Sequence, residues 1–274
     1  MRASASRVVR DLVYRTVDDR RLRLDIHLPD PAEGHPPVLV YLHGGGFQSG
    51  ERTDRERERA AALAAHGFAV ATVEYRFSDA ASFPAQRDDA RAAIEWLREN
   101  AGELGVNASR IGAWGASAGG HLAALLALGV PESNERPSVD AAVLWFAAVD
   151  LDAMSRGTAL EREILDSGEL DALLGGMFDI HDPIHRQADP LSQVSISASP
   201  LLVMTGDRDR IVDVAQSERL HNSLTAAGAD SQLWILGGAG HEDDAFESPR
   251  IIGAIAAFFA HHLGDLETTG HRTN

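Results

Sequence analysis

The stretch Arg110-Ile111-Gly112-Ala113-Trp114-Gly115-Ala116-Ser117-Ala118-Gly119-Gly120 decides the expected fold. It contains a short apolar run at 111–114, then Gly-x-Ser-x-Gly, and it leads into an Ala- and Leu-rich run at 120–128 with helical composition. A serine on a sharp turn between a strand and a helix is the nucleophile-elbow arrangement. The two glycines of the motif are required because side chains there would crowd the strand and the helix. The stretch predicts Ser117 as a nucleophile, with a simple helix-capping serine as the alternative.

Working outward, further apolar runs rich in Val, Ile and Leu alternate with longer Ala-rich stretches of helical period. This alternation is typical of a parallel sheet with helices on both faces. Two early segments alternate apolar and polar side chains around Asp18-Asp19, which predicts an antiparallel hairpin at the sheet edge. The prediction is an α/β fold with a mostly parallel sheet of eight strands, at residues 9–16, 21–27, 38–42, 69–74, 111–114, 141–147, 201–205 and 232–236.

Three helix starts can also be predicted. Thr-x-x-Glu at 53–56 fits a capping box that would open a helix through residue 65. Ser-Phe-Pro at 82–84 and Ser-Pro at 248–249 would open helices ending near residues 100 and 262. Opposite charges alternate along 51–59, so this run is expected to form the solvated face of the first helix.

The length of 274 residues suits one domain over 1–274. Residues 151–199 break the alternation of strands and helices, and they carry glycines and prolines among short helical pieces. We predict a small lid-like insertion there, after the sixth strand. The last residues, 266–274, lack a pattern and are expected to form a disordered tail.

Composition excludes several functional classes. Apolar residues make up 44% and charged residues 24%, as in ordinary globular proteins. The formal net charge of −16 would repel nucleic acid and anionic membranes. Cysteine is absent, which excludes a thiolate nucleophile and cysteine metal sites. The chain has neither an apolar leader nor a membrane-length apolar run, so we expect a cytoplasmic protein without a membrane partner.

A second motif, His43-Gly44-Gly45-Gly46-Phe47, directly follows the expected strand at 38–42. Consecutive glycines expose backbone N–H groups, and such donors can stabilise the anion formed when a nucleophile adds to an ester carbonyl. The motif therefore predicts an oxyanion hole. His43 itself is expected only to tie the loop down by hydrogen bonding.

An acid and a base should complete the site. The strand at 201–205 runs into Gly-x-x-Asp ending at Asp209, and the strand at 232–236 runs into a glycine-rich loop ending at His241. The chain order Ser, Asp, His is that of α/β-hydrolases and differs from the other protease triads. Asp209 is preferred to Asp207, and Asp150 is held in reserve.

Taken together, these ordered motifs resemble the α/β-hydrolase carboxylesterases of the His-Gly-Gly-Gly type, related to the hormone-sensitive-lipase group. The runs at 74–77, 83–86 and 109–111 are most similar to the bacterial branch that includes feruloyl and acetyl esterases. The resemblance covers about residues 38–262. It implies that the N–H groups of Gly45, Gly46 and Ala118 hold the oxyanion. It also implies a serine carboxylesterase that hydrolyses small, short-acyl esters through an acyl-enzyme on Ser117, without a cofactor.

Other readings stay open at this point. The same triad would serve an arylformamidase or another amide or peptide-bond hydrolase, and a binding protein that lost turnover is a further alternative. Phe47 and Phe77 lie on expected loops and are predicted to line the substrate pocket. Histidines and aspartates at 179–185 have metal-ligand types, but a proline interrupts the helix that would align them, so no metal is expected. We expect a monomer or homodimer acting on a small-molecule ester.

Overall fold

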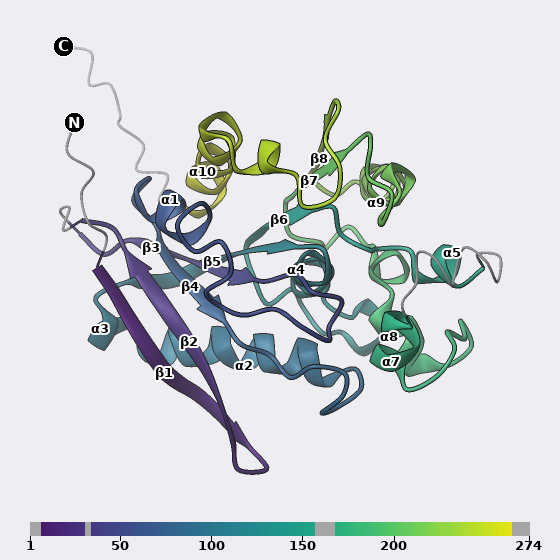
Figure 1. The fold of residues 1–274 in the computed structure, drawn as a ribbon, viewed down its shortest axis with the longest axis horizontal. Coiled ribbons are helices and arrows are strands. Elements are labelled where there is room, and N and C mark those ends of the chain that lie inside the picture. Colours follow the sequence, from purple (N-terminus) through teal and green to yellow (C-terminus); the bar gives the residue numbers. More distant parts are fainter. Residues whose placement is uncertain (1–6, 31–33, 157–167, 265–274) are drawn as a thin grey trace.

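The computed structural model describes residues 7–30, 34–156 and 168–264. Its centre is one eight-stranded sheet with the order β1-β2-β4-β3-β5-β6-β7-β8 (Figure 1). β1 pairs with β2, and β2 with β4, in antiparallel fashion, and all later pairs are parallel. The predicted mostly parallel eight-stranded sheet is thereby confirmed. The strands are β1 (Arg7–Val17), β2 (Arg20–Leu28), β3 (Pro37–Leu42), β4 (Ala69–Val73), β5 (Asn107–Ala116), β6 (Ala141–Trp145), β7 (Leu201–Gly206) and β8 (Ser231–Leu236).

Helices cover both faces of the sheet, each over its own apolar cluster. On one face α2, α4 and α9 bury their apolar side chains, and on the other face α1 and α10 do so. Every residue of α4 is buried, as expected of a helix that is apolar all round. The helices are α1 (Ala60–Ala64), α2 (Ala85–Glu99), α3 (Ala101–Leu104), α4 (Ala118–Leu128), α5 (Leu151–Ser155), α7 (Glu169–Leu174), α8 (Pro183–Ala188), α9 (Val214–Ala226), α10 (Pro249–Leu263) and the short 3₁₀ helices η1 (Pro131–Ser133), η2 (Pro190–Gln193) and η3 (Asp244–Glu247).

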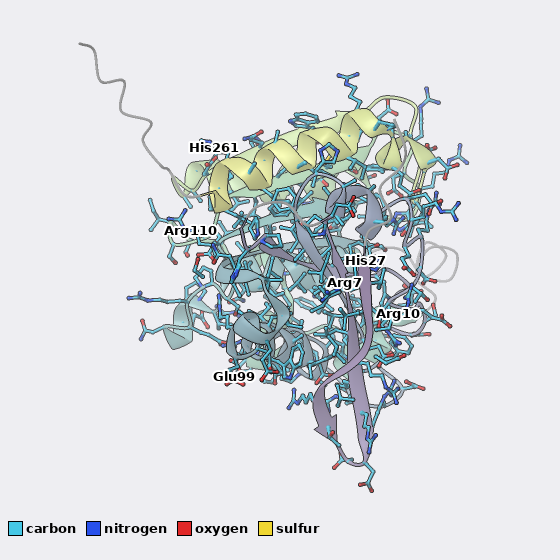
Figure 2. The ribbon with its side chains drawn as sticks, turned by 90° about the vertical axis from the view of Figure 1, so that its left-hand side faces the viewer. Arg7, Arg10, His27, Glu99, Arg110 and His261 are labelled. Carbon is cyan, nitrogen blue, oxygen red and sulfur yellow. The ribbon has the colours of Figure 1, made fainter. Side chains whose placement is uncertain are left out.

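The antiparallel hairpin forms the first edge of the sheet, and Figure 2 shows it from the side with Arg10 on β1 and His27 on β2. Its turn residues Asp18 and Asp19 both have positive φ angles, 46° and 65°. Two successive left-handed residues suit the twist of a tight hairpin, and Asp tolerates that conformation better than most residues. The local sequence therefore accounts for the turn.

The predicted capping box at residues 53–56 is wrong. Helix α1 begins only at Ala60, and the preceding residues form turns. Thr53 donates its hydroxyl to Glu51 at 3.3 Å, and Glu56 accepts from Arg10 at 2.6 Å rather than returning to the turn. A long-range ion pair thus takes the carboxylate that the capping box would have used.

The run 51–59 is not the face of a helix, since residues 52–59 form turns, but its predicted exposure to solvent holds for six of its nine residues. Two of its cations are exceptions. Arg59 is 3% exposed, and the Arg52 side chain is 16% exposed. Arg52 pairs with Asp25 at 3.0 Å, a carboxylate whose side chain is fully buried. Alternating charges fit a solvated face, but they fit equally well a loop whose cations reach carboxylates far away in the sequence.

The segment after β6 contains the short helices α5, α7 and α8. Helix α7 is tied to the loop before α2, because the N–H of Phe83 donates to the carbonyl of Leu173 at 2.7 Å. Part of the predicted lid-like insertion, 157–167, and the predicted tail, 266–274, lie outside the described residues. In the part of the chain that is described, no helix combines the length and apolar character needed to cross a membrane.

Candidate active site

Ser117 lies on a strained turn between β5 and α4, with φ 52° and ψ −117°. Its N–H donates to the carbonyl of Trp145 on the neighbouring strand at 2.9 Å, and its side chain makes no capping hydrogen bond to the helix. A Cβ added at Gly115 would lie 2.1 Å from the carbonyl oxygen of Gly119, and one at Gly119 would lie 2.0 Å from that of Leu42. Both glycines are therefore required for this turn, as the sequence predicts.

His241 and Asp209 reach Ser117 from the loops that follow β8 and β7. The Nε2 atom of His241 lies 3.0 Å from the Ser117 Oγ, and its Nδ1 lies 2.8 Å from the Asp209 Oδ2. The Asp209 Oδ1 accepts the N–H groups of Ile211 and Val212 at 2.8 and 2.9 Å. The Asp209 carboxylate is fully buried, and the His241 side chain is 11% exposed. This chain of hydrogen bonds can move a proton away from the serine and hold the resulting imidazolium.

The glycine-rich loop after β3 lies alongside the serine. A Cβ added at Gly44 would be 3.5 Å from the Ser117 Cβ. Gly45 and Gly46 have positive φ angles of 115° and 59°, and the Gly45 carbonyl accepts two backbone N–H groups at 3.0 Å from the loop that follows. The N–H groups of Gly45, Gly46 and Ala118 make no hydrogen bond to any residue that the structure describes. Within the described part of the chain, these three backbone donors have no partner, and Ala118 directly follows the candidate nucleophile.

His43 fastens this loop, as expected. Its Nδ1 lies 2.7 Å from the Gly44 carbonyl oxygen, and its own carbonyl accepts the Tyr75 hydroxyl at 2.8 Å. The two rings are stacked with 4.6 Å between centroids. Burial lowers the pKa of His43, so the ring stays neutral and can serve as a fixed hydrogen-bonding strut.

The two aromatic residues predicted to line a pocket lie in different surroundings. Phe47 is 6% exposed and packs edge-on against His121, with 5.3 Å between ring centroids. Phe77 packs edge-on against His43 and lines a cavity of about 390 Å³. That cavity is not lined by Ser117, Asp209 or His241.

Asp150 and Asp207, the alternatives to Asp209 as the catalytic acid, have structural roles. Asp150 accepts the N–H of Ala153 at 2.9 Å and so caps α5, and it pairs with Arg219 at 2.6 Å. Asp207 accepts the N–H of Gly238 at 2.6 Å, which ties the two loops that carry the acid and the base. Neither is bonded to His241. The choice of Asp209 as the acid therefore agrees with the geometry.

His121, on the first turns of α4, is buried and neutral. Its Nδ1 lies 2.8 Å from the Ala148 carbonyl oxygen, and burial lowers its pKa to about 4. In the unfolded chain the His121 imidazole is protonated near pH 6.5, whereas in the folded chain it is protonated only near pH 4. This histidine therefore weakens the fold progressively as the pH falls through that window.

We expect the free energy of unfolding of the wild type to drop by about 2 to 3 kcal/mol more between pH 7 and pH 4.5 than that of His121→Gln. Urea unfolding of both proteins at the two pH values measures the difference. Because the variant retains the other buried histidines, the double difference isolates this ring. Equal losses in the two proteins would contradict the assignment.

Three charged residues near the site, Arg59, Glu169 and Glu242, were not predicted from the sequence. Glu242 directly follows His241 with φ 54°, and its carboxylate pairs with Arg59. The carboxylate of Glu169, at the start of α7, lies against Gly46: a Cβ added to that glycine would fall 2.1 Å from Glu169 Oε1. Local patterns hold no signal for either contact, because each joins segments separated by more than a hundred residues.

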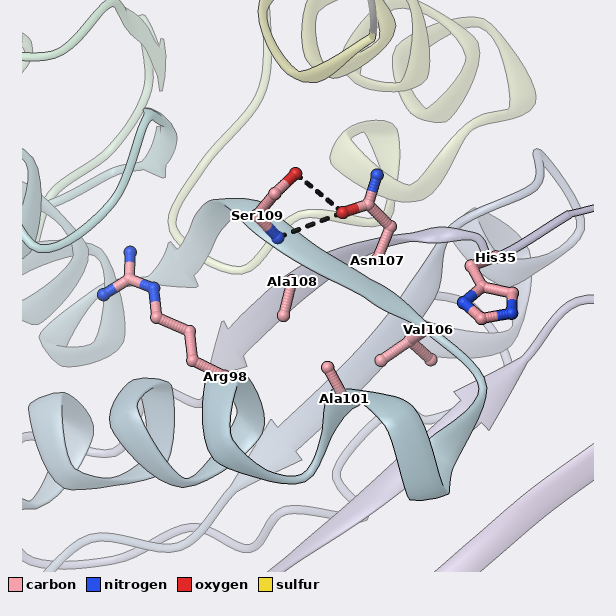
Figure 3. A pocket seen from close by; sticks show the side chains of 7 residues that line it. All are labelled: His35, Arg98, Ala101, Val106, Asn107, Ala108 and Ser109. Carbon is pink, nitrogen blue, oxygen red and sulfur yellow. Dashed lines mark hydrogen bonds between the residues drawn. The ribbon is translucent and has the colours of Figure 1, made fainter.

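Other candidate sites lie elsewhere or are occupied by internal bonds. A cavity of about 690 Å³ is lined by His35, Arg98 and Asn107 at the amino end of β5, the end remote from Ser117 (Figure 3). Within residues 179–185, His185 Nδ1 accepts the N–H of Asp179 at 3.0 Å. No group of three or more His, Asp or Glu among the described residues is arranged to hold a metal ion.

The sheet order, together with a strand–turn–helix serine that meets a loop aspartate and a loop histidine, defines an α/β-hydrolase fold. A solved structure, a truncated carbohydrate esterase from gut microbiota, matches with a TM-score of 0.82 and 25% identity, covering 94% of this chain and 96% of that one. The chain belongs to the BD-FAE family, whose model matches residues 24–224.

Curated relatives carry esterase names. Esterase LipC of Mycobacterium tuberculosis is 30% identical over 78% of this chain and 55% of its own length. The ethyl acetate hydrolase of Pseudomonas putida is 28% identical over 85% of this chain and 75% of its own. The chain thus spans little more than half of the first of these relatives.

Proposed function

We propose that the protein is a serine carboxylesterase that hydrolyses small, short-acyl esters through an acyl-enzyme on Ser117. The observation that carries the proposal is the hydrogen-bonded chain Asp209–His241–Ser117, together with N–H groups of Gly45, Gly46 and Ala118 that find no acceptor among the described residues. The esterase names of the similar proteins support the same reaction class. A cytoplasmic location and a monomeric or dimeric state stay predictions.

In the proposed reaction, His241 Nε2 takes the hydroxyl proton while Ser117 Oγ attacks the ester carbonyl. The backbone N–H groups of Gly45, Gly46 and Ala118 stabilise the oxyanion of the tetrahedral intermediate. His241 then gives its proton to the departing alcohol oxygen, and the acyl group remains on the serine. A water molecule repeats the cycle and releases the acid. Asp209 keeps the Nδ1 proton facing its carboxylate throughout, so Nε2 stays available as the base.

Two observations support a small substrate. The matching relative from Pseudomonas putida is named for ethyl acetate, a two-carbon acyl ester. The described part of the segment after β6 contains only short helices, which suits a shallow wall better than a deep tunnel for a long chain.

The proposal is tested with a series of p-nitrophenyl esters from acetyl to dodecanoyl, together with N-formylkynurenine. We expect kcat/KM to be highest for the two- to four-carbon acyl groups and N-formylkynurenine to be a poor substrate. A preference for the dodecanoyl ester would overturn the short-acyl assignment. A preference for N-formylkynurenine would instead assign the site to amide hydrolysis.

Glu169 gives a prediction about substrate charge. Its carboxylate lies against Gly46, one of the proposed oxyanion donors, and it forms no ion pair with any residue in the described ranges. A negative charge at this position should repel an anionic acyl group. We expect Glu169→Gln to raise kcat/KM for mono-p-nitrophenyl succinate about three- to tenfold relative to p-nitrophenyl butyrate.

The matched control is Glu103→Gln, which removes the same charge from α3, near the amino ends of β3 and β5. This variant should leave the ratio of the two kcat/KM values within twofold of the wild type. A ratio that does not move in Glu169→Gln would show that the carboxylate does not face the bound ester.

A further inference from the structure

Arg59, the residue before α1, is a buried cation with partners from three parts of the chain. Its Nε lies 2.7 Å from Glu247 Oε1, its Nη1 donates to the Tyr41 hydroxyl at 2.5 Å, and its Nη2 pairs with Glu242. The guanidinium also lies over the Trp145 ring, 5.5 Å from the centroid. With 3% of its surface exposed, Arg59 has little contact with water, so these bonds are weakly screened.

Both carboxylates belong to the loop that carries His241. Glu242 is the next residue, and its positive φ of 54° is a conformation that an L-residue keeps only when its surroundings enforce it. Glu247 ends η3, and its side chain is 5% exposed. Arg59 therefore binds this loop at two points: at Glu242, directly after His241, and at Glu247, where η3 ends.

The Glu242 carboxylate also lies beside the glycine-rich loop. A Cβ added at Gly44 would be 3.1 Å from Glu242 Oε1 and 3.5 Å from the Ser117 Cβ. An uncompensated negative charge there would favour the imidazolium form of His241 and oppose an oxyanion at the glycine N–H groups. The Arg59 guanidinium supplies the compensating positive charge.

We infer that Arg59 is a positioning residue for catalysis: through Glu242 and Glu247 it fixes the loop that carries His241, and it neutralises the carboxylate next to the proposed oxyanion hole. The inference rests on the proposed function. Asp209 faces the same imidazole from the loop after β7, Asp244 lies on η3, and Arg55 pairs with Asp244 and Glu247 from outside. None of these groups bonds to Glu242, so the two charges of the Arg59–Glu242 pair can be varied separately.

The test is a charge cycle with four proteins: wild type, Arg59→Gln, Glu242→Gln and the double variant. We expect Arg59→Gln to lower kcat for p-nitrophenyl acetate about 10- to 100-fold with KM within threefold. The acid limb of its kcat/KM profile should move about half a pH unit upward, because Glu242 is left uncompensated. Glu242→Gln should move that limb downward, and the double variant should return it to the wild-type position.

Arg55→Gln is the matched control. It removes a cation from the same loop and from the same Glu247, but it leaves Glu242 paired. Its kcat should stay within twofold and its acid limb should not move. A loss of packing alone cannot shift the limb in opposite directions in the two single variants.

The outcomes separate the inference from the proposed function. Hydrolysis by the wild type that is lost in Ser117→Ala supports the function, and its absence overturns the function. When the wild type is active, an acid limb that stays in place in both single variants, or moves the same way in both, overturns the role of Arg59. Should Arg59→Gln fail to fold, Glu242→Gln still decides, because that side chain is 37% exposed and tolerates an isosteric amide.

Discussion

Replacing Ser117 with alanine is expected to lower kcat/KM for p-nitrophenyl acetate about 10⁴- to 10⁶-fold. The variant keeps the N–H groups of Gly45, Gly46 and Ala118, which have no acceptor in the described ranges, so it can still bind the ester and polarise its carbonyl. It lacks the atom that attacks and forms the acyl-enzyme. The remaining rate should therefore be that of water at an otherwise assembled site.

Two measurements accompany this prediction. A fluorophosphonate probe should add to the wild type at Ser117, identified by peptide mass, and should not label the variant. Ser109→Ala is the matched control, since Ser109 lies on the same strand and its hydroxyl donates to Asn107 Oδ1 at 2.7 Å, remote from the carboxyl end of β5 that carries Ser117. That control should retain wild-type activity and labelling. An active Ser117→Ala protein would place the nucleophile elsewhere.

The elements of the site that sequence could predict are those whose constraint is local. The positive φ of Ser117 needs the glycines of its own pentapeptide, and the structure gives each a carbonyl oxygen about 2 Å from an added Cβ. The acid follows the buried strand β7, and the base follows β8, the parallel strand beside it at the edge of the sheet. Because parallel strands end at one edge, their loops converge. Short motifs placed on the expected strands were therefore enough to nominate Ser117, Asp209 and His241.

The misread elements are those set by distant partners. The Arg59 side chain bonds Glu242 and Glu247, which are 183 and 188 residues away along the chain. The Glu56 carboxylate pairs with Arg10, 46 residues away, and so does not form the predicted capping box. A window of a few residues shows alternating charges in both cases and does not show whether a charged side chain faces water or a distant ion-pair partner.

Glu169 illustrates a second limit. It follows a stretch with no periodic pattern, and its contact with Gly46 depends on how α7 is held against the loop before α2. Propensity and motif reasoning give no distance between such segments. The residues proposed to carry out the chemistry lie in short motifs, whereas Glu169, proposed to act on substrate charge, reaches the site only through the packing of α7.

Asp209→Asn is expected to lower kcat about 10⁴-fold while the fold is retained. Oδ1 of Asp209 accepts two backbone N–H groups, from Ile211 and Val212, so the amide oxygen of the variant will stay there. Its NH₂ group must then face Nδ1 of His241, which becomes the acceptor of that hydrogen bond. The ring proton moves to Nε2, which lies 3.0 Å from Ser117 Oγ and can no longer accept the hydroxyl proton.

Asp207→Asn is the matched control for this change. It makes the same replacement two residues earlier, on a carboxylate that accepts only the Gly238 N–H among the described backbone donors. We expect that control to keep kcat within a few-fold, since the amide oxygen can still accept that bond. Steady-state rates and thermal melts are measured for both variants. A lower kcat with an unchanged melting temperature indicates a wrong imidazole tautomer, whereas a lower melting temperature indicates a loosened loop. A wild-type kcat in Asp209→Asn would mean that His241 takes its orientation from another group.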